Sequence, residues 1–428
     1  MAKLHSDRPV LTYDDAEFGA LLGRVLSPAR PLQSAEFLRG RHQQLAEIKQ
    51  ALYQPGRHIL IHGLRGVGKS SLAQTAAYAL AREQDPILVG CDRHSTFQSI
   101  VREIFDEVDR RDPRLRQRAS EVSGSFSRFG LTFGGKVQEV KGAAELPAST
   151  NDAVRLVQYL CEVCASAPVI VIDEFDLVED RDEQERFATF IKLVSDKHVN
   201  AKFIFCGIGE SVDAIMSAHG SADRYFHTVG LGQLPWEARE EIITTAADAV
   251  GVDVDRDTSI RIARISDGFP HYVHFLSEKL FWQVFYKKSD GVATPNDFGE
   301  AMLAASQSME MRLRAPYEKA TRKYNNDYET VLWAVADGHE LIRPSKEIFA
   351  SYETMMRQLS DEPLDRAKFN QRLNSLKKTS HAAILTGSRA GWYEFTEKMV
   401  RGYVRLRAET AGVELEVDHP RIQRSRGT

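Results

Sequence analysis

One eight-residue segment, residues 63–70, constrains the fold of this chain more than any other part of its sequence. It reads Gly-Leu-Arg-Gly-Val-Gly-Lys-Ser and completes the pattern G-x-x-x-x-G-K-[ST] of a phosphate-binding loop. Its glycines allow backbone amides to approach phosphate oxygens without interference from a Cβ atom. The pattern requires a strand before the loop and a helix after it. The apolar run 58–62 and the helical pattern 70–82 meet both requirements.

Each part of this loop has an expected role toward a nucleotide. Lys69 reaches the β- and γ-phosphates, Ser70 holds Mg²⁺, and the following helix directs the positive end of its dipole at the phosphates. The sequence therefore predicts ATP and Mg²⁺ as cofactors. The residues expected to bind the nucleotide are Gly63, Leu64, Arg65, Gly66, Val67, Gly68, Lys69, Ser70 and Ser71.

Two adjacent carboxylates follow a second apolar run. Residues 169–172, Val-Ile-Val-Ile, end in Asp173 and Glu174. We expect Asp173 to hold Mg²⁺ through water and Glu174 to orient and deprotonate the attacking water. Glu174 and Lys69 are therefore both predicted to be catalytic. Adjacent acids also occur in plain solvated turns. Their position at the end of an apolar strand, downstream of the loop, favours the catalytic interpretation.

Short apolar runs alternate with helical patterns over the first half of the chain. Each run is apolar throughout, as in strands that are buried on both faces of a parallel sheet. The runs span residues 57–62, 86–91, 168–172, 202–206 and 227–231. The predicted fold class is therefore an α/β P-loop NTPase, a parallel five-stranded sheet flanked by helices.

The rest of the chain is divided by changes in pattern. Residues 112–150 are rich in glycine, serine and charge, which predicts an insertion in the core. Only helical patterns follow residue 235, and from about residue 320 three helices, a hairpin and a final helix predict a winged helix. The predicted parts are an arm at 1–35, an ATPase core at 36–234, a helical lid at 235–318, a winged-helix domain at 319–410 and a tail at 411–428.

Composition limits the environment of the protein. Its 428 residues, 43% hydrophobic and 27% charged, suit a globular protein of two or three domains. No apolar signal segment and no run of about 20 apolar residues is present, so we expect a cytoplasmic protein without a membrane partner. Cys161 and Cys164 could belong to a metal site or to an apolar helical stripe. The absence of a second Cys/His pair at ligand spacing favours packing.

Basic residues concentrate near the C-terminus, although the net charge of the chain is −4. Between residues 366 and 407, ten basic residues are opposed by two acidic ones, which is the electrostatic footprint of a nucleic-acid backbone. The third helix of a winged helix is expected to enter the major groove, with the hairpin tip beside it. A winged helix that contacts protein is the alternative. The expected contacts with double-stranded DNA are Lys368, Arg372, Lys377, Lys378 and Arg389.

The loop, the acidic pair and the helical lid together resemble AAA+ ATPases of the origin-recognition and replication-initiator type, and the related STAND ATPases. The resemblance spans roughly residues 36–408. Residues 37–41, Phe-Leu-Arg-Gly-Arg, resemble the segment that wraps adenine in that family, which implies a nucleotide contact for Arg41. It also implies a sensor after the strand 202–206, where this chain offers Glu210.

The resemblance implies two further nucleotide contacts. In Gly268-Phe-Pro-His-Tyr, His271 stands where many members have a sensor arginine. Because a neutral histidine cannot match a guanidinium charge, we expect slow hydrolysis or a nucleotide-gated switch. Arg224 lies where these ATPases place an arginine finger, which implies a catalytic role in a neighbouring subunit and an ATP-dependent homo-oligomer. A surface arginine that caps a helix end is the alternative.

These inferences predict a slow ATPase whose nucleotide state controls DNA binding and recruits an unidentified protein partner. A STAND-like signalling switch, with its winged helix as an internal lock, is the alternative. A phosphotransferase is disfavoured by the lid and the winged helix that follow the core.

Overall fold

The computed structural model describes residues 9–81, 84–111, 149–164, 166–209, 222–288, 290–322, 326–387 and 389–416. The chain divides into two units. The core unit comprises Pro31–Leu64 and Lys69–Gly232, and the C-terminal unit comprises Met1–Arg30, Arg65–Gly68 and Gln233–Thr428. Most of the predicted insertion, the sensor candidate Glu210 and the end of the predicted tail lie outside the described residues.

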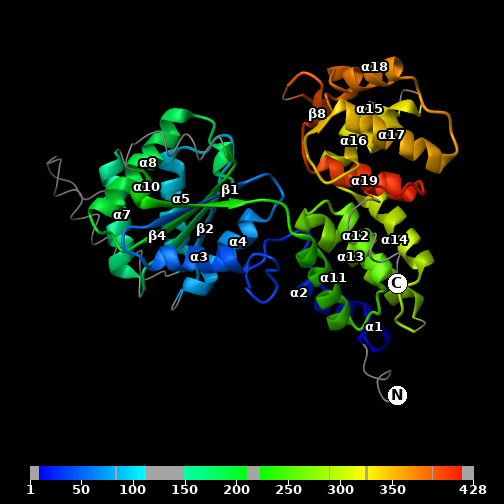
Figure 1. The fold of residues 1–428 in the computed structure, drawn as a ribbon. Coiled ribbons are helices and arrows are strands. Elements are labelled where there is room, and N and C mark those ends of the chain that lie inside the picture. Colours follow the sequence, from blue (N-terminus) through cyan, green and yellow to red (C-terminus); the bar gives the residue numbers. More distant parts are fainter. Residues whose placement is uncertain are drawn as a thin grey trace, which may run out of the picture. The chain divides into compact units, whose positions relative to one another are not determined.

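A parallel sheet of five strands forms the centre of the core unit (Figure 1). The strands are β1 (His58–Gly63), β2 (Ile87–Gly90), β3 (Val169–Asp173), β4 (Lys202–Gly207) and β5 (Phe226–Leu231). Their order is β2-β3-β4-β1-β5, and every neighbouring pair is parallel. This arrangement confirms the predicted fold class. It also places β4 between the strand that enters the phosphate loop and the strand that ends in two acids.

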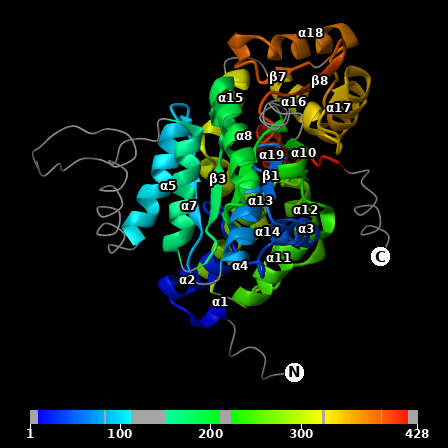
Figure 2. The same ribbon diagram turned by 90° about the vertical axis from the view of Figure 1, so that its left-hand side faces the viewer.

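Helices pack on both faces of this sheet because successive residues of each strand point to opposite faces and both sets are apolar. One face receives α5 (Phe97–Arg111), α7 (Thr150–Val163) and α8 (Arg181–Asp196) in a core rich in phenylalanine. Helices α5 and α7 lie side by side there (Figure 2). Cys161 and Cys164 pack against the same core, as the apolar-stripe interpretation predicts. Helices α3 (His42–Tyr53) and α4 (Lys69–Leu80) lie on the other side of the sheet (Figure 1).

The C-terminal unit also contains residues from the N-terminal end of the chain. Helices α1 (Pro9–Thr12) and α2 (Asp15–Val25) belong to it. Phe18 on α2 is fully buried and stacks on Phe285, with ring centroids 4.3 Å apart. Asp14 and Glu17 form a capping box that starts α2. The segment predicted as an arm therefore contributes to a hydrophobic core, and the D-x-x-E pattern at its helix start was the signal for it.

Two groups of elements make up the remainder of this unit. The lid consists of α11 (Trp236–Val250), α12 (Arg256–Ile265), α13 (Pro270–Lys287) and α14 (Pro295–Ser308). The C-terminal module consists of α15 (Met311–Thr321), α16 (Asp327–Ala336), β6 (Arg343–Pro344), α17 (Ser345–Leu359), α18 (Arg366–Leu376), β7 (Leu385–Thr386), β8 (Trp392–Phe395) and α19 (Val400–Thr410).

The three short strands of the module pair antiparallel in the order β6-β8-β7. The apolar residues Phe369, Leu373 and Leu376 on α18 are completely buried. The assignment of the C-terminal module as a winged helix stays a prediction. Val413 and Leu415, in the segment predicted as a tail, are buried as well. Among the helices in the described ranges, none combines the length and the hydropathy that a membrane span requires.

Candidate nucleotide site

The phosphate loop connects β1 to α4, as the sequence predicts. Gly63, Gly66 and Gly68 have φ angles of +152°, +81° and +96°, a region that residues with a Cβ atom rarely adopt. A Cβ atom at Gly63 would lie 2.2 Å from the carbonyl oxygen of Leu231, at the end of β5. Gly63 is therefore required by the close approach of a neighbouring strand, in addition to the access to phosphate that the sequence suggested.

Lys69 is the first residue of α4, and its side chain turns back into the loop. Its Nζ donates hydrogen bonds to the carbonyl oxygens of Gly63 and Leu64, over 3.0 and 3.1 Å. An ammonium group beside a loop of left-handed glycines, at the start of a helix, is a donor set that suits the phosphates of a nucleotide. The residues present therefore fit ATP. Ser70 follows on the first turn of α4, and its role as a Mg²⁺ ligand stays a prediction.

The two predicted acids lie at the carboxyl end of β3. Asp173 accepts a hydrogen bond from the backbone N–H of Glu174 over 2.9 Å, and its carbonyl oxygen accepts one from Cys91 N–H over 2.9 Å. Glu174 is exposed and has a φ of +53°. Such strained backbone at a residue other than glycine costs on the order of 1–3 kcal/mol and concentrates at functional sites. The strain supports the role predicted for Glu174.

A buried thiol lies between the loop and the acids. Cys206 on β4 has no exposed surface, and its Sγ lies 3.8 Å from the carbonyl oxygen of Lys69. Burial, followed by the charge of Asp173, raises the pKa of Cys206 well above its ordinary value, while Lys69 opposes the shift. The thiol therefore stays protonated and can donate to an acceptor. Sequence reasoning missed Cys206, although its place at the end of the strand before Gly207 was visible.

Two other predicted nucleotide contacts are engaged with the protein backbone. The Ser71 hydroxyl oxygen accepts a hydrogen bond from Leu32 N–H over 3.1 Å. Arg41 is buried directly before α3 and donates to the carbonyl oxygen of Gly232, and burial lowers the pKa of its guanidinium. Both interactions hold segments around the core unit in place. Their roles toward the nucleotide stay predictions.

The sensor candidate His271 is the second residue of α13, in the C-terminal unit. Its Nδ1 lies 3.0 Å from the carbonyl oxygen of Pro28, which can only accept, so Nδ1 carries a proton. In the neutral ring Nε2 then has a lone pair and cannot donate to phosphate. Nε2 also lies 3.9 Å from a carboxylate oxygen of Glu310. His271 could act as a donor to a phosphate through Nε2 only in its protonated form.

Arg224 lies on the short helix α10 (Ala222–Tyr225), directly before β5, and is exposed. The next residue, Tyr225, donates to Asp196 on α8 over 2.9 Å and so anchors this helix to the core unit. An exposed arginine on an anchored turn is accessible to a neighbouring subunit. Its role as an arginine finger stays a prediction.

The cluster of basic residues near the C-terminus is smaller on the surface than in the sequence. Arg401 and Arg405 are 1% and 2% exposed and form ion pairs inside the C-terminal unit. Arg372 pairs with Asp327 over 3.1 Å, and its guanidinium lies 5.0 Å from the centroid of the Tyr328 ring. Two of the ten basic residues counted in the sequence are therefore not part of a surface cluster, because charge counted along the sequence does not reveal which side chains are buried.

Four of the five predicted DNA contacts are exposed. Lys368 on α18 pairs with the nearby Asp365 over 3.5 Å, and Lys377 and Lys378 lie directly after the same helix. Arg389 lies between β7 and β8, with its guanidinium 3.7 Å from the centroid of the Trp392 ring. These four cations are accessible to a polyanion.

The fold and the geometry around Lys69 and Asp173 define a P-loop NTPase. Residues 38–204 match the family model described as an AAA ATPase domain, which agrees with the resemblance to AAA+ ATPases. The match covers the phosphate loop and the acidic pair and ends within β4. Arg224, His271 and the C-terminal module lie beyond it.

Similar solved structures share little sequence with this chain. A Walker-type ATPase of Pyrococcus abyssi is 15% identical, with 88% of this chain and 99% of that chain covered and a TM-score of 0.49. Cdc6p from Pyrobaculum aerophilum is 14% identical, with 91% and 98% covered and a TM-score of 0.44. The Aeropyrum pernix Orc1 protein in complex with DNA is 14% identical, with 91% and 96% covered and a TM-score of 0.45. No curated protein matches the chain.

Proposed function

We propose that this protein is a slow ATPase whose nucleotide state controls the binding of its C-terminal module to duplex DNA, where it recruits or positions another protein. The observation that carries the proposal is the convergence of Lys69, Asp173 and Cys206 at the carboxyl edge of one parallel sheet. Ligands of open parallel sheets bind at this edge.

Each residue at this edge has a defined task in hydrolysis. Lys69 would neutralise charge on the β- and γ-phosphates, and Ser70 with Asp173 would hold Mg²⁺, which would polarise the phosphoryl group when bound. Exposed Glu174 orients water and accepts its proton. Cys206 donates toward Asp173 and so keeps the carboxylate directed at the metal site. We expect slow turnover because His271 directs its Nδ1 proton at Pro28 rather than at a phosphate and lacks the permanent charge of a sensor arginine.

The DNA part of the proposal depends on the exposed cations of the module. Lys368 on α18 is exposed, as are Lys377 and Lys378 directly after it, whereas Phe369 on the same helix is buried. Because phosphate contacts release condensed counterions, exposed lysines in this position stabilise binding in a way that depends strongly on salt. Arg389, stacked on Trp392, adds a pre-oriented guanidinium at the hairpin.

We expect that replacing Lys368, Lys377 and Lys378 together with alanine reduces duplex binding and leaves ATP hydrolysis unchanged. The slope of log affinity against log salt should flatten by about 0.9 for each DNA phosphate that the variant no longer neutralises. Fluorescence anisotropy of a labelled duplex over a salt series measures this slope. A matched control replaces Lys319, Lys346 and Arg357, which are exposed elsewhere in the module. An equal reduction of affinity in the control would show that only net charge matters.

A STAND-like switch, with the module as an internal lock, is the second candidate function. The observation that favours it is the burial of Arg401 and Arg405, which removes two cations from the surface of the module. Such a switch would bind ATP and assemble without binding DNA. The two candidates therefore differ in whether the wild-type protein binds duplex DNA at low salt.

We propose further that Arg224 acts on the nucleotide of a neighbouring subunit. Arg224→Ala should leave ATP binding near normal and lower turnover by at least about tenfold, since it removes a charge that stabilises the transition state. Mixing this variant with Glu174→Gln protein should restore part of the activity, because some sites then combine an intact Glu174 with an intact Arg224. Arg155→Ala, exposed on α7, is the control. No recovery on mixing, together with no ATP-dependent sedimentation change in the wild type, argues against a shared site.

A further inference from the structure

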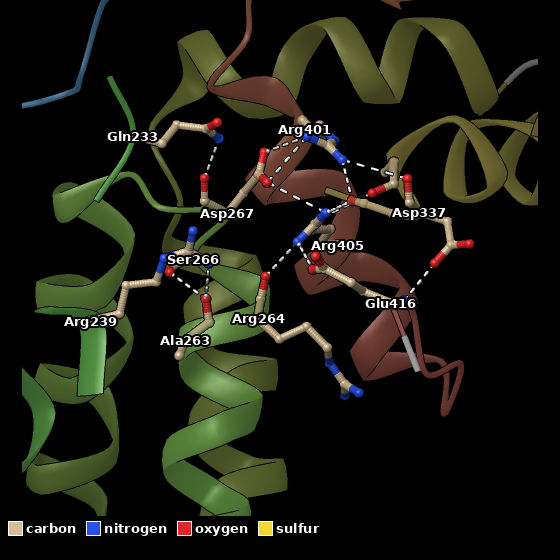
Figure 3. Close-up of polar contacts among 12 residues, drawn as sticks. Gln233, Arg239, Ala263, Arg264, Ser266, Asp267, Asp337, Arg401, Arg405 and Glu416 are labelled. Atoms are coloured by element: carbon tan, nitrogen blue, oxygen red, sulfur yellow. Dashed lines mark hydrogen bonds and ion pairs between the residues drawn. The ribbon is translucent and has the colours of Figure 1, made fainter. Parts of the chain in front are cut away.

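A buried carboxylate joins the lid to the C-terminal module (Figure 3). Asp267 lies between α12 and α13 and is 3% exposed. Arg401 Nη1 lies 3.2 Å from both of its carboxylate oxygens, and Arg405 Nη2 lies 3.4 Å from one of them. Both arginines belong to α19, so one aspartate of the lid holds two cations of the last helix. Burial lowers the pKa of Arg401 to about 10, while Asp267 opposes the shift and helps to keep the guanidinium charged.

The same arginines also hold the end of α16. Arg405 Nε donates to the carbonyl oxygen of Ala336 over 2.9 Å, and both arginines donate to the carbonyl oxygen of Gly338. Arg405 Nη1 lies 2.8 Å from a carboxylate oxygen of Glu416, near the end of the described chain. The cluster of Asp267, Arg401, Arg405 and Glu416 therefore balances two positive charges with two negative ones away from water (Figure 3).

The backbone around Asp267 is fitted closely to the segment where the chain enters this unit. Asp267 and Gly268 have φ angles of +52° and +74°, and a Cβ atom at Gly268 would lie 2.8 Å from Gln233 Cβ. Leu234 N–H donates to the carbonyl oxygen of Gly268 over 2.7 Å, and the Gln233 side chain donates to that of Asp267. Residues 233–234 are therefore held against Asp267 and Gly268 by both packing and hydrogen bonds.

Helix α19 is enclosed by the lid on one side and by the module on the other. The Tyr272 hydroxyl on α13 donates to the carbonyl oxygen of Met399 over 2.7 Å, and a Cβ atom at Gly402 would lie 2.5 Å from the Tyr272 ring. Arg264 on α12 pairs with Glu409 over 2.9 Å. Helix α19 also packs on α14, α15 and α16. The last helix thus belongs to the lid as much as to the module.

We infer that the lid and the C-terminal module move as one rigid body. Helix α19 is the rigid connection, or joint, between them, and Asp267 is the positioning residue that fixes this joint. A buried ion pair adds little stability compared with apolar packing, but an alternative position of α19 would leave buried charges without partners. The buried ion pair therefore selects one position of α19. Only the consequence of this inference rests on the proposed function: a nucleotide-driven movement of α13 would carry the module with it.

The joint can be tested by the distance between two spin labels in the full chain. The labels are placed at Leu303→Cys on α14 and Gln371→Cys on α18, both exposed, after Cys161→Ala and Cys164→Ala replacement of the partly exposed thiols. Pulsed electron resonance without nucleotide or DNA should give one narrow distance distribution. ATP should leave it unchanged. Failure of ATP or DNA binding would not affect the nucleotide-free result, so the joint and the proposed function are tested separately.

Asp267→Asn removes the charge, keeps the shape, and suits the left-handed backbone. We expect it to broaden the distance distribution and to lower the melting temperature. The control Asp257→Asn, at an exposed ion pair on α12, should change neither. In Asp267→Asn/Arg401→Met no unpaired charge is introduced, so thermal stability should recover while the distribution stays broad. This double variant decides the question if the single variant does not fold. A narrow distribution in folded protein without the ion pair, or an ATP-dependent shift in the wild type, would overturn the inference.

Discussion

Replacing Lys69 with alanine is expected to abolish ATP binding while leaving the fold intact. The ammonium group is directed into the loop by the carbonyl oxygens of Gly63 and Leu64, and a bound nucleotide offers it phosphate oxygens instead. Hydrogen bonds to charged groups contribute about 1.5–3 kcal/mol each. Losing two of them reduces affinity on the order of a hundredfold or more.

Titration with a fluorescent ATP analogue measures this reduction in affinity, and circular dichroism checks the fold. Lys197→Ala, at an exposed position after α8, is the matched control and should bind as the wild type does. Unchanged affinity in Lys69→Ala would remove the phosphate loop from the nucleotide site.

Glu174→Gln is expected to keep ATP binding and to lose hydrolysis. Glutamine preserves the size of the side chain and its left-handed backbone position but cannot accept a proton from water. General-base catalysis contributes about 10²–10⁴-fold to a rate, so turnover should fall by a factor in this range.

Phosphate release at saturating ATP measures the effect on turnover. Glu179→Gln, at an exposed acid that pairs with Arg93 over 3.8 Å, is the control and should turn over normally. Wild-type turnover in Glu174→Gln would exclude this residue from the mechanism.

The nucleotide site could be predicted in large part because its signals are local in the sequence. The loop at 63–70 and the acids after β3 each combine a short pattern with an adjacent apolar strand. The order of the strands could not be predicted, because it depends on pairing between residues far apart in the chain. For that reason Cys206 was missed, since only the position of β4 between β1 and β3 brings its thiol to Lys69 and Asp173.

Charge was the least reliable guide to the C-terminal region. Arg401 and Arg405 resemble surface cations in the sequence, and their partner Asp267 lies on a different helical connection far earlier in the chain. A buried arginine and an exposed one have the same local pattern when the acid that pairs with it is distant. The apolar spacing of Phe369 and Leu373 does indicate the buried face of α18, and the role of the exposed Lys368 on that helix toward DNA stays a prediction.

The affinity of the wild-type protein for duplex DNA at low salt, measured with ATP, with ADP and without nucleotide, tests whether the nucleotide controls the C-terminal module. Anisotropy of a labelled duplex provides all three values on the same protein. Nucleotide control of the module predicts binding that is tighter with ATP than in either other condition, and that weakens steeply as salt rises. Equal binding in the three conditions would contradict nucleotide control. No duplex binding with ATP would reject the DNA function and leave the STAND-like switch as the better account of this ATPase.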